Sequence, residues 1–320
     1  MTESSSRHAT TVLTAVLAAV VLIALPAAAR AQDGIPGVLA PGVSSALVQE
    51  GFVFTEGPVG TADGGLYFSD IRVNDNRGKT YHLDVAGKMT VVREPTNSAN
   101  GLALTKDGEL LFAEGGGRSI TKRNRDGSIV TVIDNHAGQK MLAPNDLIVD
   151  ARGGIYFTDP GPRPVVPGRP TYVSYLPPGA KDSIILDDKV ARPNGLTLTN
   201  NGRALIVDDT IGNTVFIYDV QPDGKVTNKR PFAQLRDIPA GAESGADGMA
   251  IDAEDRIYIT TVAGVQVFDA KGGYLGVIKS ARQGANVAFA GPGKQTLYIT
   301  AREGLYRIST LSKGPSRLGK

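Results

Sequence analysis

One short pattern recurs six times along this chain, and it constrains the fold more than any other feature. Each copy starts with an oxygen-bearing side chain, the lead residue, and opens an alternating apolar run. A turn follows about eight positions later, and then an apolar-aromatic run. The six lead residues are Glu56, Asn100, Asn145, Asn194, Asp247 and Asn286. By subtraction of these numbers they lie 39 to 53 positions apart, so one structural unit is expected to recur six times.

The repeat length and the strand pattern together predict an all-β fold, the six-bladed β-propeller. Repeats of about 40–50 residues that contain several short strands are typical of propellers, in which every blade needs neighbours to bury its faces. The 39 glycines and 19 prolines suit short strands joined by tight turns. After the N-terminal segment, no stretch shows helical periodicity over about ten residues. We therefore expect six four-stranded blades around a central channel.

A strand ahead of the first repeat is expected to close the ring. Apolar and polar residues alternate enough in residues 46–54 to predict a strand. The last repeat ends after residues 305–308 and needs a further strand to complete its blade. Pairing of these two segments would complete the last blade and leave no open sheet edge at the seam. We therefore place one propeller domain at residues 46–312. A flexible lead-in rich in Gly, Pro and Ala is expected at 32–45, and a C-terminal tail at 313–320.

Residues 1–31 are expected to be a secretory signal peptide. A mostly apolar run extends from residue 12 to residue 26, and Ala29-Arg30-Ala31 gives the small-x-small pattern of a signal-peptidase site. Cleavage after Ala31 would deliver the mature chain to the periplasm or the medium, whereas an uncleaved segment would act as a membrane anchor. The chain has no cysteine, so disulfides and thiolate nucleophiles are excluded.

The charge balance argues against nucleic acid as a partner. There are 34 Lys and Arg against 32 Asp and Glu, which gives a formal net charge of +2, and the basic residues are scattered among acidic ones. A nucleic-acid-binding surface needs a clustered basic face. We expect a small-molecule partner, no nucleic acid, no membrane contact after signal cleavage, and a monomer or small homo-oligomer.

The lead residues are the strongest candidates for a functional site. Inner strands of a propeller converge on its channel, so side chains at one offset of every repeat should meet at one mouth. Carboxylate and carboxamide oxygens are donors that suit Ca2+ and also accept Mg2+ or Mn2+, whereas Zn2+ usually takes His or Cys. We expect one divalent cation, with Ca2+ favoured over Mg2+, Mn2+ and Zn2+. Its expected ligands are Glu56, Asn145, Asn194 and Asp247.

A plainer interpretation of two copies is a hairpin turn, because Asn-Gly is the strongest two-residue hairpin signal. Asn100-Gly101 and Asn194-Gly195 carry that signal. However, a separate turn lies about eight residues further on in each copy, and Glu56 occupies the same slot without being a turn residue. The metal hypothesis covers all of these copies, and the turn interpretation does not.

Other chemically active side chains fit structural roles better. His82 is expected in a strand and His136 in a loop, each without a catalytic role. Ser69 and Ser244 lack a plausible His partner in the repeat scheme, which argues against a serine triad. Acidic residues that end the aromatic runs are expected to cap turns rather than to bind an ion. Those residues are Asp70, Asp159, Asp208 and Asp209.

Taken in order, the repeats resemble the gluconolactonase and senescence-marker-protein (regucalcin) family of six-bladed propellers. The resemblance rests on the runs EGPV, ANGL, PNDL with IYFTDPG, PNGL, DGMAID and TLYITAREGLYRI, and it extends from about Glu56 to Ile308. Members of that family are mostly divalent-metal-dependent lactone hydrolases. The resemblance implies that Glu56, Asn194 and Asp247 bind the ion. It also implies that Asn145 completes or water-bridges the site, and that Asp247 is the general base.

Two departures from the family pattern fall near the predicted mouth. EGPV continues with Gly60 where Trp is common. The second blade has three glycines between Glu114 and Arg118 where Glu-His followed by Arg is common. Both changes leave the lead residues intact and bear on substrate identity. Glu114 and Arg118 are expected to contact substrate, while Asn100 and Asn145 are expected to orient substrate hydroxyls or waters.

The expected reaction is the opening of a lactone, with a sugar lactone favoured, in which the ion polarises the carbonyl group and Asp247 activates a water. Two other classes of function stay open. One is a non-catalytic propeller whose ion plugs the channel or binds a ligand or a protein. The other is a propeller enzyme of the strictosidine-synthase or arylesterase kind.

Overall fold

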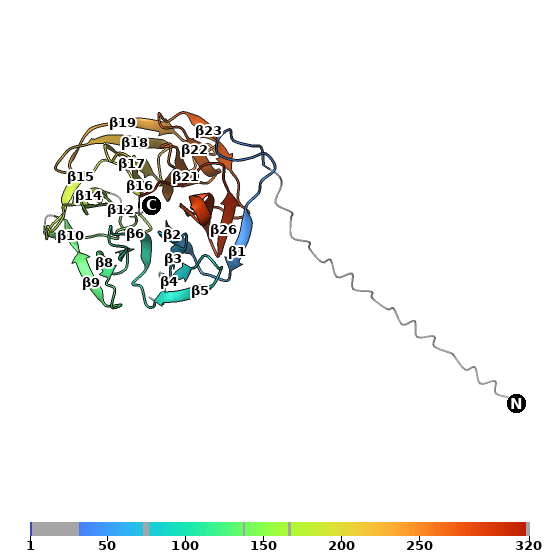
Figure 1. Ribbon diagram of the computed structural model, residues 1–320, viewed down its shortest axis with the longest axis horizontal. Helices are drawn as coiled ribbons and strands as arrows, with labels where there is room; N and C mark the ends of the chain where they lie inside the picture. Colours follow the sequence, from blue (N-terminus) through green and yellow to red (C-terminus); the bar gives the residue numbers. More distant parts are fainter. Residues whose placement is uncertain (2–31, 73–76, 137, 166–167, 318–320) are drawn as a thin grey trace.

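The chain forms a ring of six four-stranded β-sheets around a common axis, as Figure 1 shows. This computed structural model describes residues 1, 32–72, 77–136, 138–165 and 168–317. Each of the six sheets has four antiparallel strands, so the predicted six-bladed propeller is confirmed. The predicted signal segment, apart from Met1, lies outside the described residues. Within the described residues, no helix has the length and apolar character needed to cross a membrane.

In blades one to five the strands follow one another from the channel outwards. Blades one, two and three comprise β2 (Thr55–Gly60), β3 (Leu66–Asp70), β4 (Lys79–Leu83) and β5 (Met89–Arg93); β6 (Ala99–Leu104), β7 (Leu110–Glu114), β8 (Ser119–Arg123) and β9 (Ile129–Ile133); β12 (Leu147–Val149), β13 (Ile155–Asp159), β14 (Tyr172–Leu176) and β15 (Ile184–Asp187). Blades four and five comprise β16 (Pro193–Leu198), β17 (Ala204–Asp209), β18 (Thr214–Val220) and β19 (Val226–Gln234); β20 (Met249–Ile251), β21 (Ile257–Thr261), β22 (Gly264–Phe268) and β23 (Tyr274–Ile278). A ribbon of β10 (Asn135–His136) and β11 (Gln139–Lys140) lies between blades two and three.

The sixth blade is completed by a strand from the other end of the chain. Its remaining elements are β24 (Asn286–Ala290), the short 3-10 helix η1 (Pro292–Lys294), β25 (Thr296–Ala301) and β26 (Gly304–Ser309). β1 (Ala46–Glu50) pairs antiparallel with β26, with Ala46 opposite Arg307. This pairing satisfies the edge groups of β26, and it confirms the predicted closure of the ring by an N-terminal strand.

The apolar core lies between neighbouring blades. Leu111 of the second blade and Phe157 of the third belong to one buried cluster, and Tyr258 of the fifth blade shares another with Leu297 of the sixth. The second strand of each blade is therefore covered on both faces, and β7 and β13 are buried along their whole length. Burial on both faces explains why these strands appear in the sequence as continuous apolar-aromatic runs rather than as alternating ones.

Residues 32–45 pack against the ring instead of forming the flexible lead-in that their composition suggested. Ile35, Val38 and Leu39 are buried and belong to the apolar cluster shared by blades five and six. The N–H groups of Ile35 and Leu39 each donate to the other residue's carbonyl at 2.8 Å, and Gly37 takes a φ of 71° inside this turn. The glycine thus serves a tight turn that brings the apolar side chains onto the ring.

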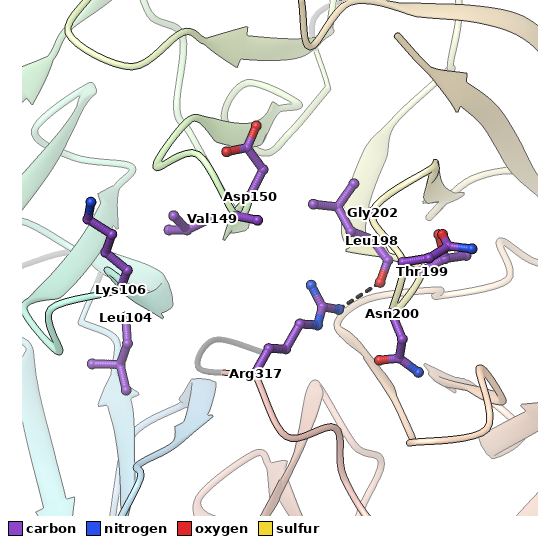
Figure 2. Close-up of a pocket in the computed structure, with 11 residues that line it drawn as sticks. Leu104, Lys106, Val149, Asp150, Leu198, Thr199, Asn200, Gly202 and Arg317 are labelled. Atoms are coloured by element: carbon purple, nitrogen blue, oxygen red, sulfur yellow. Dashed lines mark hydrogen bonds between the residues drawn. The ribbon is translucent and has the colours of Figure 1, made fainter. Parts of the chain in front are cut away.

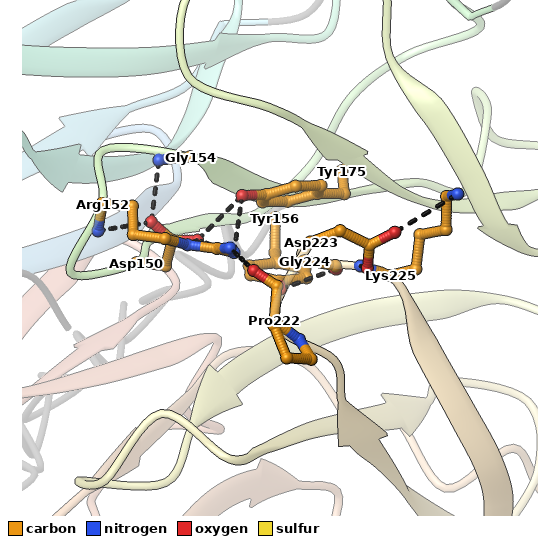
Figure 3. A network of polar contacts seen from close by, with 9 residues as sticks. All are labelled: Asp150, Arg152, Gly154, Tyr156, Tyr175, Pro222, Asp223, Gly224 and Lys225. Carbon is orange, nitrogen blue, oxygen red and sulfur yellow. Dashed lines mark hydrogen bonds and ion pairs between the residues drawn. The ribbon is translucent and has the colours of Figure 1, made fainter.

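Polar contacts also join neighbouring blades, as Figure 3 shows for the third and fourth. Asp150, in the turn after β12, accepts hydrogen bonds from the guanidinium of Arg152 and the hydroxyl of Tyr175, both at 2.9 Å. Arg152 also donates to the carbonyl of Pro222, in the turn between β18 and β19. One charged network therefore ties the inner turn of the third blade to an outer turn of the fourth.

Candidate metal centre

The lead residues stand at the same end of six inner strands. These strands are β2, β6, β12, β16, β20 and β24. Each of them contacts its two neighbours around the channel. Every lead residue is the first or second residue of its strand, or lies two residues before it. The repeat offset that is visible in the sequence therefore corresponds to one end of the channel, which we call the near mouth.

Hydrogen bonds connect the lead residues across blade boundaries. The N–H of Gly101 in the second blade donates to the carbonyl of Asn145 in the third at 2.8 Å. The amide nitrogen of Asn286 in the sixth blade donates to the carboxylate of Glu56 in the first at 3.1 Å. The blades that are most distant in the sequence are thus joined at the near mouth, and the lead residues hold one another in place.

Glycine after a lead residue allows neighbouring blades to approach closely. A Cβ added to Gly57 would lie 2.0 Å from the carbonyl oxygen of Asn100, and one added to Gly195 would lie 2.1 Å from that of Asp247. Asn100 and Gly195 lie inside strands β6 and β16. The hairpin-turn interpretation of the two Asn-Gly pairs is therefore wrong, because glycine provides room for the next blade here rather than a turn.

The two carboxylates of the predicted ligand set differ in exposure. Glu56 is 2% exposed, and its Oε2 accepts the N–H of Gly57 at 2.8 Å in addition to the bond from Asn286. Asp247 is only partly buried, and its backbone N–H donates to the carbonyl of Thr260 at 3.1 Å. Of the two, Asp247 is the carboxylate that a water or a small molecule can reach.

Two lead carboxamides carry buried oxygens that accept no hydrogen bond. Neither Oδ1 of Asn100 nor Oδ1 of Asn194 has a hydrogen-bond partner within the described part of the chain. The amide nitrogen of Asn194 donates to the hydroxyl of Thr210 at 3.1 Å, which fixes the side chain and leaves its oxygen available. Burying a polar oxygen without a partner costs free energy, and a cation would remove that cost. The residues present therefore fit a hard cation.

The donor set is mixed rather than wholly ionisable. Across the residues that the structure describes, no three His, Cys, Asp or Glu side chains are grouped as metal ligands. A cation at the near mouth would thus depend on Glu56 and Asp247 together with the carboxamides of Asn145 and Asn194. Carboxylates combined with neutral oxygen donors suit Ca2+, which takes six to eight such ligands including waters.

Asp208 is a site residue that the sequence interpretation missed. It is fully buried, and its Oδ1 accepts the N–H of Gly195 at 3.0 Å. Burial raises the pKa of Asp208 well above its usual range, and the nearby carboxylates of Asp247 and Asp146 raise it further. Of these two adjacent aspartates, Asp209 has the expected capping role, because its Oδ1 accepts two backbone N–H groups. Adjacent residues of a strand point to opposite faces of the sheet. That alternation is the sequence signal that could have predicted different roles for Asp208 and Asp209.

Arg192 brings a positive charge to the near mouth. Its side chain is buried, and its guanidinium donates to the carbonyls of Pro160 and Gly161, both at 3.3 Å. Burial lowers the pKa of Arg192 and the charge of Arg163 lowers it further, while Asp247 acts in the opposite direction. Arg192 therefore fastens the proline-rich loop that follows β13 beside the carboxylate of Asp247.

The structure gives Glu114 a role other than the expected substrate contact. Its side chain is 1% exposed, and its carboxylate binds the guanidinium of Arg93 and the hydroxyl of Thr121, both at 2.5 Å. The amide of Asn97 donates to its other oxygen at 2.8 Å. Arg118 is half-buried, and its Nε donates to the carbonyl of Met141, between the β10–β11 ribbon and the third blade. Glu114 therefore joins blades one and two, and its carboxylate is fully used by the protein.

The expectation that His136 lies in a loop is wrong. It is part of β10 and 1% exposed, and its Nε2 lies 2.9 Å from the carboxylate of Asp159. Its Nδ1 lies 3.1 Å from the hydroxyls of both Ser174 and Ser183. All four side chains are buried, so this Ser, His and Asp group attaches β10 to the third blade. His82 lies in β4, as expected.

The capping roles expected for two other aspartates are confirmed. Asp70 accepts the N–H groups of Val53 and Phe54 at 2.8 and 3.0 Å. Asp159 accepts those of Leu142 and Ala143 at 2.7 and 2.6 Å. In both blades the carboxylate at the end of the second strand fixes the segment that leads into an inner strand, so it stabilises the near mouth without being a ligand.

Comparison with known proteins places the chain in one family. The model described as the SMP-30/Gluconolactonase/LRE-like region matches residues 54–303, which include all six lead residues. A gluconolactonase of Zymomonas mobilis is 29% identical over 291 residues, covering 82% of this chain and 80% of that relative. The diisopropyl-fluorophosphatase of Loligo vulgaris is 25% identical over 281 residues, covering 80% and 88% of the two chains.

Solved structures agree with this assignment. A gluconolactonase from Xanthomonas campestris gives a TM-score of 0.73 at 26% identity, covering 87% of this chain and 91% of that one. The calcium-binding protein regucalcin from Agrobacterium tumefaciens gives a TM-score of 0.72 at 19% identity, covering 86% and 98%, a likeness that shows the fold alone. Since the family model spans most of the sequence, from the first lead residue to the last, the chain belongs to the SMP-30/gluconolactonase/LRE-like family.

Proposed function

We propose that this protein is a divalent-metal-dependent hydrolase that opens lactones, with sugar lactones as the preferred class. The observation that carries the proposal is the near mouth, where Asp247 is accessible and the oxygens of Asn100 and Asn194 lack donors within the described residues. Relatives named gluconolactonase, lactonohydrolase and lactonase support the reaction class.

The cation would be held by oxygens from four blades. Its proposed ligands are Glu56, Asn145, Asn194 and Asp247. Ca2+ is favoured, and Mg2+, Mn2+ or Zn2+ are alternatives. When bound, such an ion polarises a carbonyl group and stabilises the negative charge that develops on its oxygen. Glu56 and Asn194 are already oriented by hydrogen bonds, so these two ligands need little reorganisation.

Asp247 is the proposed general base. Its carboxylate would remove a proton from a water molecule while the water oxygen bonds to the lactone carbonyl carbon. The ring C–O bond then breaks, and the proton passes from Asp247 to the departing ring oxygen. The product is a hydroxy acid, and the carboxylate of Asp247 is restored.

Asn100 and Asn145 are the proposed contacts for the rest of the substrate. Both side chains are partly exposed at the near mouth. Their carboxamides can accept and donate hydrogen bonds, which suits the hydroxyl groups of a sugar lactone. A substrate with several hydroxyls would therefore be oriented better than a plain aliphatic ring.

We also propose that the protein is exported to the periplasm or the medium. The apolar run followed by Ala29-Arg30-Ala31 supports this. N-terminal sequencing of the protein recovered from those fractions should begin at Gln32. Recovery of the uncleaved chain in the membrane fraction would instead indicate an anchor.

The substrate class is tested with a panel of sugar lactones, aliphatic lactones and aryl esters, with proton release followed by a pH indicator. We expect sugar lactones to be turned over fastest. Asp247→Asn should lower kcat by about 100-fold or more, as removal of a general base does. Asp188→Asn changes an exposed carboxylate of an outer-strand turn and should leave kcat unchanged. Turnover of aryl esters alone, or full lactone turnover by folded Asp247→Asn, would contradict the proposal.

A further inference from the structure

The C-terminal segment crosses the other mouth of the channel, at the far ends of the inner strands. The N–H of Leu311 donates to the carbonyl of Val38 at 2.9 Å, and that of Gly314 to the carbonyl of Lys294 at 2.8 Å. The ammonium of Lys294 donates back to the carbonyl of Pro315 at 2.6 Å. The segment is thus fastened to the folded body on both sides of Gly314.

This course places the side chain of Arg317 in the far mouth, where β6, β12 and β16 end. Figure 2 shows its guanidinium pointing into the space beside Leu198, whose carbonyl accepts its Nη2 at 2.6 Å. The Nε of Arg317 is buried and has no hydrogen-bond partner within the described residues. One backbone carbonyl is therefore the sole hydrogen-bond acceptor for this guanidinium in the part of the chain described.

No carboxylate of the described residues matches the charge of Arg317. Among the described residues no Asp or Glu forms an ion pair with it. The carboxylate of Asp255 is near enough to affect its pKa, but that carboxylate accepts the N–H of Asn200 at 2.7 Å. Burial lowers the pKa of Arg317 to about 10, partly opposed by Asp255, so the guanidinium remains charged at neutral pH. A largely buried cation without a counter-charge is costly, and an anion would offset that cost.

The space in front of Arg317 is a cavity of about 320 Å³. Its lining includes Lys106, which is exposed and forms no ion pair within the described residues, and Asp150, whose charge is matched by Arg152. The unmatched charge around this cavity is therefore positive. A guanidinium also has the planar, forked geometry that suits carboxylate and phosphate oxygens.

We propose that the far mouth binds a small anion, a carboxylate or phosphate group, through the guanidinium of Arg317 and the ammonium of Lys106. This site lies at the opposite ends of the inner strands from the lead residues, and it is independent of the proposed hydrolase activity. It would give a channel that takes a cation at one mouth and an anion at the other.

Calorimetric titration of the full chain, freed of divalent cations, tests this site. Inorganic phosphate and succinate are titrated separately at constant ionic strength, with sodium chloride as the balancing salt. The wild-type chain should bind one anion per molecule. Arg317→Gln should raise Kd about tenfold or more, because it removes a charge-assisted hydrogen bond. Arg307→Gln, an exposed change on β26 outside the cavity, should bind like the wild type.

A second variant covers the case in which Arg317→Gln does not fold. Lys106→Gln changes an exposed side chain, and it should raise Kd severalfold while circular dichroism and melting temperature stay unchanged. Absence of saturable binding by the wild-type chain overturns the proposal, as does wild-type affinity in folded Arg317→Gln. If only Lys106→Gln folds, wild-type affinity in that variant overturns it.

Discussion

Single residues at the near mouth are held by atoms of the neighbouring blade. Asn286 of the sixth blade donates to Glu56 of the first, and Gly248 of the fifth blade packs directly against Asn286. Blades that are separated in the sequence therefore share one small cluster of contacts. A change of a few atoms in one blade should disturb side chains in the next two.

Gly248→Ala tests this coupling. A Cβ at that position would lie 1.7 Å from Cγ of Asn286, so the side chain that donates to Glu56 must shift. We expect the free energy of unfolding, measured by urea titration, to fall by about 2 kcal/mol or more. Gly115→Ala is the matched control, because the nearest atoms outside its chain neighbours would be 3.7 Å from the added Cβ, and it should change stability by less than about 1 kcal/mol. Equal stability of the two variants would contradict the coupling.

The role of a residue could be predicted from the sequence where the same position recurs in every copy of the repeat. The lead residues share one offset in six copies, so their common position followed from the sequence. Asp208 was missed because its role depends on which face of β17 its side chain occupies, and that face brings it to Gly195 and near Asp247. The partners of Glu114 were hidden for another reason: the pair with Arg93 crosses a blade boundary and has no counterpart in the repeat pattern.

At the scale of strands and turns, Tyr175 on β14 joins two blades. It is fully buried, and a Cβ added to Gly154 or Gly224 would lie 2.2 or 2.1 Å from its side chain. Its hydroxyl donates to Asp150, which also accepts Arg152 (Figure 3). Two glycines thus make room for one aromatic ring, whose polar end completes a charged turn.

The same network predicts a pH dependence of stability. Burial alone would raise the pKa of Asp150, but hydrogen bonds from Arg152, the N–H of Gly154 and Tyr175 hold it below its usual value. A carboxyl with a depressed folded-state pKa adds stability above its unfolded pKa, about 3.9, and that stability is lost as pH falls through the folded pKa. Urea titrations should therefore show wild type exceeding Asp150→Asn near pH 7, with a smaller difference near pH 3. A constant difference would contradict this role.

At the scale of the whole molecule, both ends of the chain stabilise the ring. β1 completes the sixth blade, residues 32–45 cover the core shared by blades five and six, and residues 311–317 cross the far mouth. The six-fold repeat was sufficient to predict the ring and its closure. It could not predict the packing of the two ends, because they have no counterpart among the repeats and composition was the remaining guide.

A matched pair of valines tests the packed N-terminal segment. Val38 is completely buried, whereas Val85 is 61% exposed in a turn of the first blade. Val38→Ala should lower the free energy of unfolding by about 2 kcal/mol, the usual contribution of a buried aliphatic side chain, and Val85→Ala should have little effect. Thermal or urea unfolding measures both variants. Indistinguishable stabilities would mean that residues 32–45 are not part of the folded body.

The most direct test of the near mouth combines cation binding with lactone hydrolysis on the same samples. Ca2+ is titrated by calorimetry into chelator-treated wild type and Glu56→Gln, and sugar-lactone hydrolysis is measured before and after the addition. We expect one ion per wild-type chain, with hydrolysis lost on chelation and restored by the ion. Glu56→Gln should lose both properties while keeping its fold. Hydrolysis that survives chelation, or unchanged cation affinity in Glu56→Gln, would contradict a catalytic cation held by the lead residues.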